Sequence, residues 1–359
     1  MGNLRTNEQL SQLEQDARAD YAARRTTLIV DGNNMLYRML YQPNLGFLSS
    51  PSGESTGGTF GVLRSLKKVL THNPYINKAV FVLDAGMSAR RLAIDPDYKG
   101  ARRKSKKDAV DAKGVPLPWS QKFEMKGKQA MSLSWRKSFL YAFEENLAQL
   151  ETILPALCVR VLSVNGKEGD DVAALVATDD ELSGPNALIV SEDKDFLQLV
   201  CDTITVWRPI ADIVVTKDNF LDVVGFDQSV YLLARAIIGD ASDGIVGVKG
   251  TGPKAAEAIF AQATDFDSMV AFCSASTKKS IQQVSAPEHL DRVRRNVALM
   301  DLSQEVFTVE DLEHVQKVMW EKAKMDVPAA CDVLNEMGAE QTVIELENPA
   351  MNPYRMLEE

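Results

Sequence analysis

The chain has 359 residues, of which 45% are hydrophobic and 25% charged, with a formal net charge of −10. This composition supports a globular protein with a substantial core, and the acidic balance excludes a protein that coats nucleic acid through uniform positive charge. The cysteines are far apart with no CxxC pair, and no apolar run approaches the roughly 20 residues of a membrane span, so we expect a cytoplasmic protein without zinc or disulfides.

Residues 1–25 are polar and helix-prone, and the segment after them alternates short apolar runs with amphipathic stretches. The runs TLIV, AVFVL, VRVLSV and ALIV are typical of buried strands, whereas GNNMLYRMLYQ and TFGVLRSLKKVL have helical spacing. From Gly86 to about Ser134 the chain is polar and basic, and a helical pattern returns between Trp135 and Leu154. We therefore expect an α/β fold with a mostly parallel sheet and an insertion at its edge.

Beyond about residue 230 the pattern is helical only, in YLLARAIIG, AAEAIFAQ and HLDRVRRNVALMDL, with the glycine-rich GIVGVKGTGPK between the first two. This pattern predicts a small all-α module. The last stretch mixes helical runs with strand-like ones such as TVIEL, and no role follows from it. The expected parts are an N-terminal extension (1–25), an α/β core (26–229) with an insertion at about 86–150, the helical module (230–302) and a C-terminal extension (303–359).

Acidic residues follow each strand candidate. They are Asp31, Asp84, the group Glu168, Asp170 and Asp171, and then Asp193 and Asp195, with the later pair Asp240 and Asp243 after a helical run. The carboxyl ends of parallel strands share one edge of a sheet, which is where open α/β folds bind ligands. Each acid alone is more simply interpreted as a helix cap or turn residue. Together they need counter-charge, which favours Mg²⁺ or Mn²⁺.

The glycine-rich segment GVKGTGPKAA does not follow a strand and lacks the spacing of a nucleotide-binding loop. Its glycines precede a helix, an arrangement that lets the backbone approach a phosphate at the helix N-terminus. A helix-hairpin-helix turn of this kind binds the phosphate backbone of DNA independently of the base sequence. A simple connection between two helices is the alternative interpretation.

The basic run KGARRKSKK, from Lys99 to Lys107, follows the acidic residue Asp84 along the chain. A charged run alone is most simply a solvated face. Beside an acidic pocket, however, adjacent cations would draw in a nucleic-acid backbone that the pocket would otherwise repel.

The ordered motifs VDGNNMLYR, FVLDAG, RRLAIDPDYKGARR, NGKEGDDVAAL, VSEDKDFLQLV and GDASDGIVGVKGTGPKAA resemble those of the 5′-nuclease family of flap endonucleases and 5′→3′ exonucleases. The family includes the nuclease domain of DNA polymerase I. The resemblance covers roughly Thr26 to Leu302 of this chain. Two departures stand out. Glu192 replaces the usual glycine in VSEDKDF, and the segment from Asp108 to about Met131 is longer and less regular than a minimal arch.

The resemblance implies a PIN-like core with a helical arch over the site and a helix-hairpin-helix module beside it. It implies two metal sites, the first made by Asp31, Asp84, Glu168 and Asp170 and the second by Asp193, Asp195 and Asp243, with Asp171 and Asp240 in support. It further implies that Lys99 and Arg102 neutralise the scissile phosphate, while Tyr98 is placed to stack on the terminal base. The remaining expected DNA contacts are Arg103, Lys104, Lys106, Lys107, Gly247, Gly250, Gly252 and Lys254, with K⁺ at the hairpin.

These features predict a structure-specific, metal-dependent 5′-nuclease. Its expected substrates are branched or 5′-ended DNA, including flaps, with RNA in RNA·DNA primers as a further class. Two alternatives remain open. The first is a DNA-junction binding protein with weak catalysis, which the intact acids disfavour. The second is a PIN-type ribonuclease, which would share the acids but would not need the hairpin module.

Overall fold

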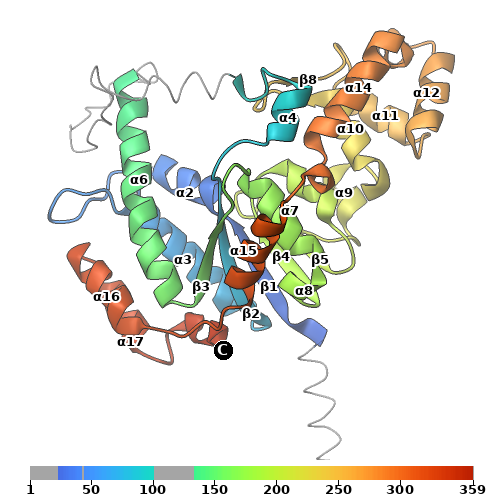
Figure 1. The fold of residues 1–359 in the computed structure, drawn as a ribbon. Helices are drawn as coiled ribbons and strands as arrows, with labels where there is room; N and C mark the ends of the chain where they lie inside the picture. Colours follow the sequence, from blue (N-terminus) through green and yellow to red (C-terminus); the bar gives the residue numbers. More distant parts are fainter. Residues whose placement is uncertain (1–22, 43, 101–132, 359) are drawn as a thin grey trace, which may run out of the picture.

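The computed structural model describes residues 23–42, 44–100 and 133–358, with the backbone alone described for 133–138. In this part of the chain a six-stranded sheet, ordered β3-β2-β1-β4-β5-β6, forms the centre of the molecule (Figure 1). The strands are β1 (Thr26–Asp31), β2 (Ile76–Leu83), β3 (Val159–Ser163), β4 (Asn186–Val190), β5 (Ile204–Arg208) and β6 (Ile213–Val215). Neighbouring strands from β3 to β5 are parallel, and β6 is antiparallel to β5. The predicted mostly parallel α/β fold is confirmed.

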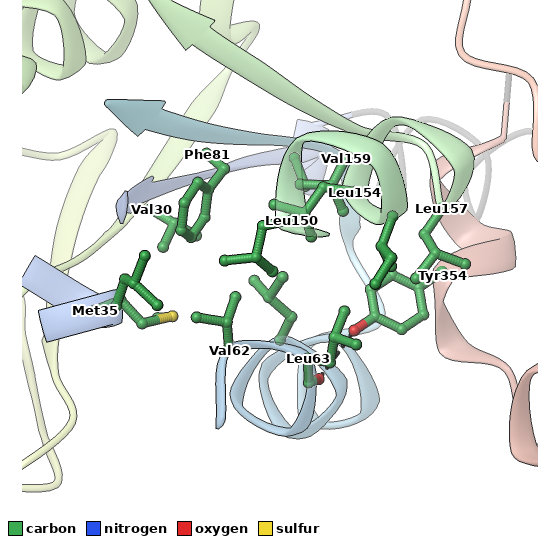
Figure 2. Packing of buried hydrophobic residues seen from close by; sticks show 14 of the residues in the cluster. Val30, Met35, Val62, Leu63, Phe81, Leu150, Leu154, Leu157, Val159 and Tyr354 are labelled. Carbon is green, nitrogen blue, oxygen red and sulfur yellow. Dashed lines mark hydrogen bonds between the residues drawn. The ribbon is translucent and has the colours of Figure 1, made fainter. Parts of the chain in front are cut away.

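Helices cover both faces of the sheet, which explains why its strands are apolar throughout. Alternate residues of a strand point to opposite faces, so Val30 and Phe81 belong to one core while Ile29 and Val80 belong to the other. Figure 2 shows Val30 and Phe81 facing the helical side chains of Met35, Val62 and Leu150 in the first core. That core is covered by α2 (Gly32–Tyr41), α3 (Gly57–His72) and α6 (Leu133–Ala156), and the other by α7 (Gly169–Thr178), with α8 (Asp180–Ser183) and α9 (Phe220–Val224) nearby.

The C-terminal segment packs against both cores of the sheet. Its elements are α15 (Val309–Trp320), α16 (Val327–Glu336), α17 (Glu340–Glu347) and the 3-10 helix η5 (Pro353–Leu357). Tyr354 is buried in the first core, where its hydroxyl donates to the carbonyl of Leu63 at 2.9 Å (Figure 2). The strand-like interpretation of TVIEL is wrong, because this run lies in α17. Val343 and Leu346 are buried there and Ile344 is 56% exposed, which is the spacing of an amphipathic helix.

The helical module has a hydrophobic core of its own and lies at the upper right of Figure 1. It contains α10 (Tyr231–Ile238), the short strands β7 (Gly239–Asp240) and β8 (Ile245–Val246), α11 (Pro253–Phe260), α12 (Phe266–Ala275), α13 (Lys279–Gln282) and α14 (Pro287–Met300). Shorter 3-10 turns complete the described chain at η1 (Lys194–Leu199), η2 (Gln228–Val230), η3 (Gln283–Ser285) and η4 (Leu302–Gln304).

Helix α4 (Ala89–Ile94) connects the sheet to the helical module, because it follows β2 and contacts α14 (Figure 1). Ser88 caps its start by accepting from the backbone N–H of Arg91. Most of the predicted arch, at 101–132, and most of the N-terminal extension, at 1–22, lie outside the described residues. The described part of the insertion is therefore α4 with the segment up to Gly100, and α6.

Candidate active site

Carboxylates from neighbouring strand ends meet along one edge of the sheet. Asp31 is the last residue of β1, and Asp84 follows β2. Asp84 Oδ1 accepts from the backbone N–H of Gly169 at 2.7 Å, which ties the end of β2 to the start of α7. Ser191 Oγ donates to Asp31 Oδ2 at 2.7 Å, which ties β4 to β1. We call this region the acidic edge and define it as Asp31, Asp84, Glu168, Asp170, Asp193 and Asp195.

Two of these acids also cap helices, as the simpler interpretation of the sequence anticipated. Asp31 Oδ1 accepts from the backbone N–H of Asn34 at 3.1 Å at the start of α2. Asp193 Oδ1 accepts from the N–H of Asp195 at 2.9 Å at the start of η1. Each cap occupies one carboxylate oxygen and fixes where the other oxygen lies. The caps therefore fix the orientation of both carboxylates.

Glu168 is at the centre of the group best suited to a cation. Glu168, Asp170 and Asp171 each offer a carboxylate oxygen within 4.8 Å of the other two. Glu168 Oε1 is buried and has no hydrogen-bond partner among the described residues. Burying such an oxygen without a partner is costly, and hard divalent cations prefer oxygen ligands. The residues present therefore fit a divalent metal ion at this point of the acidic edge.

Lys99 lies against the same carboxylate. Its Nζ donates to Glu168 Oε2 at 2.8 Å and is 3.8 Å from Asp243 Oδ2. The Lys99 backbone has a φ of 50°, in the left-handed region, and its N–H donates to the carbonyl of Asp243. Burial alone would lower the pKa of this ammonium, but the surrounding acids raise it well above its usual range. The ammonium group of Lys99 is thus held in its charged form at the acidic edge.

Arg91 donates hydrogen bonds to two of the acids. It was not among the site residues predicted from the sequence. It is 1% exposed, and its guanidinium donates to both oxygens of Asp171, at 2.6 and 2.7 Å, and to Glu168 Oε2 at 2.9 Å. Its Nε donates to the carbonyl of Leu299 at the end of α14. Both oxygens of Asp171 therefore accept hydrogen bonds from Arg91. The only signal in the sequence is a charged residue within the short helix ARRLAI.

Arg235 of α10 also donates hydrogen bonds to two acids. It too was not among the site residues predicted from the sequence. Its NH2 donates to Asp195 Oδ1 at 2.9 Å and to Asp240 Oδ2 at 2.7 Å. Asp240 Oδ1 in turn accepts from Ser242. Arg235 thereby links Asp240 to Asp195. Neither arginine could be assigned from sequence, because each pairs with acids from another element of the fold.

Tyr98 is not available to stack on a base in this structure, so that expectation is wrong here. The residue is 3% exposed and packs with Ile245, Leu299 and Met300 of the helical module. Its hydroxyl donates to Glu168 Oε2 at 3.1 Å. The ring is covered because residues distant in sequence close over it, and the side chain joins the module to the acidic edge.

Burial and crowding change the acidity of the edge. Burial raises the pKa of Asp31 to about 7, and the charges of Asp193 and Asp84 add to the rise. Burial and the neighbouring charge of Asp193 also raise the pKa of Asp195 to about 7, although Arg235 opposes this. Near neutral pH these carboxyls retain protons in part when no cation is present. Binding of a cation would therefore release protons.

The hairpin glycines have different structural requirements. Gly250 has a φ of 78°, which side chains rarely adopt. A Cβ on Gly247 would lie 2.2 Å from the carbonyl of Ile238, so that glycine is required by packing inside the module. Gly252 precedes α11, and a Cβ there would meet nothing within 4 Å. Gly252 and Lys254 are both exposed at this helix N-terminus, where backbone N–H groups can meet a phosphate.

The rest of the predicted DNA-binding run lies outside the described residues. It comprises Arg102, Arg103, Lys104, Lys106 and Lys107.

Among the described helices, none combines the length and apolar character that a membrane span requires.

Residues 26–225 match the family described as 5′-3′ exonuclease, N-terminal resolvase-like domain. The chain is 29% identical over 234 residues to a 5′-3′ exonuclease of Aquifex aeolicus, covering 65% of this chain and 68% of that protein. It is also 29% identical over 230 residues to the thermostable DNA polymerase I of Thermus thermophilus, covering 64% of this chain but 23% of the polymerase.

The fold is similar to that of the bacteriophage T5 flap endonuclease in a complex with DNA and metal ions. The TM-score is 0.56 at 19% sequence identity, covering 87% of this chain and 99% of that one. The T5 5′-exonuclease with bound divalent zinc gives the same TM-score at 21% identity. At these identities the likeness concerns the fold, in which helices cover both faces of a mostly parallel sheet. Since the family match spans more than half of the sequence, the chain belongs to the 5′-3′ exonuclease family.

Proposed function

We propose that this protein is a metal-dependent 5′-nuclease that hydrolyses phosphodiesters in branched or 5′-ended DNA, including flaps, and in RNA·DNA primers. The observation that supports this most directly is the acidic edge with Lys99 inside it. Glu168 has one buried oxygen without a partner and another oxygen that accepts from Lys99. Such a site can hold a cation and a phosphate at the same time.

The division into two metal sites remains part of the proposal. Asp31, Asp84, Glu168 and Asp170 would hold one divalent ion, Mg²⁺ or Mn²⁺, and Asp193, Asp195 and Asp243 would hold the second. When bound, a pair of such ions supplies a hydroxide nucleophile and stabilises the leaving oxygen of a phosphodiester. Arg91 and Arg235 keep the surrounding carboxylates oriented through bonds of 2.6–2.9 Å. The acids therefore need little rearrangement when the metal and substrate bind.

Lys99 would contribute directly to the reaction. Its ammonium is held by Glu168 and lies near Asp243, at the point where a phosphate would enter the acidic edge. A cation at that point stabilises the charge that develops on the phosphoryl oxygens. Arg102 follows three residues later and would assist it. The sequence order alone supports this last role.

The helical module would hold the duplex part of the substrate. The turn at Gly250 and the exposed start of α11 at Gly252 and Lys254 offer backbone N–H groups and a cation to DNA phosphates. We include K⁺ at this hairpin in the proposal. The module contacts the acidic edge through Arg235 and through the packing around Tyr98. Duplex held by the hairpin would thereby be positioned relative to the acids.

Cleavage assays on matched labelled substrates test this proposal. They compare a 5′ flap, a nicked duplex, a single strand and an RNA-primed template in Mg²⁺, Mn²⁺ or EDTA. We expect cleavage near the junction of the 5′ flap with either metal and none in EDTA. Cleavage in EDTA would contradict the metal mechanism, and binding of the flap without cleavage in either metal would indicate a junction-binding protein.

A further inference from the structure

Glu192 lies between two arginines at the end of the sheet next to the acidic edge. Glu192 Oε2 is 3.3 Å from Arg208 NH2 at the end of β5, and Oε1 is 3.9 Å from Arg38 NH1 of α2. Oε1 also accepts a short hydrogen bond from the backbone N–H of Ile210. These donors come from two separate parts of the fold, α2 and the chain from the end of β5 into the following turn. They surround the carboxylate as donors would surround any bound anion of similar size.

The donors exceed what one carboxylate can use. Each guanidinium carries five N–H groups in a planar fork that suits carboxylate and phosphate equally well. Arg208 Nε is buried and has no partner among the described residues. With Glu192 included, the three side chains still carry one net positive charge. Their exposed fractions of 15–22% leave a route from solvent.

The position of this cluster matters for a nuclease. Glu192 immediately precedes Asp193 of the acidic edge, and the charge of Asp31 acts on Arg38. The arginine cluster is thus next to the acidic edge, where a nucleic-acid strand that reached the edge could also supply a phosphate to the two arginines. The guanidiniums would offset the repulsion that the acids exert on that strand.

We propose that Arg38, Arg208 and the N–H of Ile210 form a binding site for a backbone phosphate of the substrate strand, and that the Glu192 carboxylate occupies this site in the free protein. Substrate must then displace Glu192, so this residue lowers affinity for nucleic acid. The inference rests on the proposed function, because it takes a nucleic-acid strand as the ligand. It assigns Glu192 a role in setting affinity and none in bond cleavage.

Binding measurements with Glu192→Gln test the site. The probe is a labelled 5′-flap oligonucleotide in EDTA at several salt concentrations, so that cleavage cannot interfere. We expect Glu192→Gln to bind several-fold more tightly and to show a salt dependence steeper by up to about one unit of slope, as one more phosphate contact forms. Glu192→Ala serves as a second variant if the glutamine variant fails to fold, as judged by thermal melting.

Two controls separate a phosphate site from a general effect of charge. Asp202→Asn removes the same charge from an exposed pair with Lys217 at the opposite end of β5, and it should leave affinity unchanged. Adding Arg38→Gln and Arg208→Gln to Glu192→Gln should abolish the gain. A gain that persists in this triple variant, or unchanged or weaker binding by Glu192→Gln, would overturn the proposal.

The same experiment distinguishes the two proposals. Normal flap cleavage by the wild type together with unchanged binding by Glu192→Gln would reject the phosphate site and leave the nuclease intact. Tighter binding by Glu192→Gln without cleavage by the wild type in Mg²⁺ or Mn²⁺ would reject the nuclease and retain the site.

Discussion

The acidic edge and the hairpin between α10 and α11 are both proposed to meet phosphates of the substrate, but they depend on opposite features of the chain. At the edge, charged side chains are held by other side chains, as Arg91 holds Asp171 and Arg235 holds Asp195. At the hairpin, Gly250 and Gly252 leave the backbone uncovered. Removing charge without changing shape should therefore damage the edge, whereas adding bulk without changing charge should damage the hairpin.

The largest effect is expected from Asp84→Asn, which removes one charge and preserves the shape. The amide oxygen can still accept from the N–H of Gly169, and the side-chain contact that is lost is the bond from Asn33 Nδ2, so the local fold should persist. We expect single-turnover cleavage of a 5′ flap to fall on the order of a thousandfold or more, because metal ligation contributes several kcal/mol. A melting curve monitors folding, and Asp202→Asn serves as the control. A folded Asp84→Asn protein that cleaves normally would remove this acid from the metal site.

Removing Arg91 should cost stability, since its charge is the buried support of the edge. Arg91→Met leaves Asp171 and Glu168 without their partner, and breaking a buried pair typically costs about 3–5 kcal/mol. Denaturant unfolding measures the loss. The matched control is Arg294→Met, whose pair with Asp291 is exposed and should contribute about 0–1 kcal/mol. Equal losses in the two variants would show that the buried network does not stabilise the fold.

Lys99→Ala should separate catalysis from binding at the edge. A cation aimed at the reacting phosphate acts mainly in the transition state, so we expect the single-turnover rate to fall on the order of a hundredfold. Affinity for the flap should change much less. Lys217→Ala, which removes an exposed lysine, is the control. Loss of affinity with an unchanged rate at saturating enzyme would assign Lys99 to binding alone.

The raised pKa values of the edge predict how metal binding depends on pH. Asp31 and Asp195 have pKa values of about 7, so both must lose protons before a cation binds fully. Affinity for Mg²⁺ or Mn²⁺, measured by calorimetry without substrate, should therefore rise as the pH rises through about 7. Calorimetry in buffers of different ionisation enthalpy should also detect protons released on binding.

The stability of the metal-free protein should change with pH in the opposite direction. An acid whose pKa is higher in the folded state than in the unfolded state favours folding while protonated. The contribution of Asp31 and Asp195 to stability should thus fall as the pH rises from about 4, the usual aspartate value, to about 7. Asp31→Asn should weaken this dependence. The same pH dependence of stability in the wild type and in Asp31→Asn would contradict the raised pKa of Asp31.

How well the sequence predicted each region follows from where the interactions lie. The strands and the acids after them could be predicted, because burial gives apolar runs and parallel pairing brings their carboxyl ends together. The pairing of Arg91 with Asp171 could not, since it joins two separate parts of the chain. The burial of Tyr98 has the same origin, because Leu299 covers it from the end of α14. The helical nature of TVIEL was missed because a short apolar run fits either period.

The smallest effect is expected at the hairpin, from Gly252→Val. A Cβ at this position meets nothing within 4 Å, so the variant should fold and lose no more than about 1 kcal/mol of stability. The added side chain would, however, stand between the start of α11 and a duplex phosphate. We expect cleavage of flaps with downstream duplex to fall several-fold, while a short single strand, which does not need the hairpin, is cleaved as before.

Exchange of K⁺ for Na⁺ sharpens this last test. Duplex binding by the wild type should weaken in Na⁺ if the ion lies between hairpin carbonyls and phosphate, and binding by Gly252→Val should scarcely respond. Lys254→Ala is the matched charge control, because it changes the same helix start without adding bulk and should reduce the salt slope by about one unit. Equal losses by Gly252→Val on duplex and single-stranded substrates would mean that the hairpin substitution acts through the acidic edge, and the contrast between the two regions would then fail.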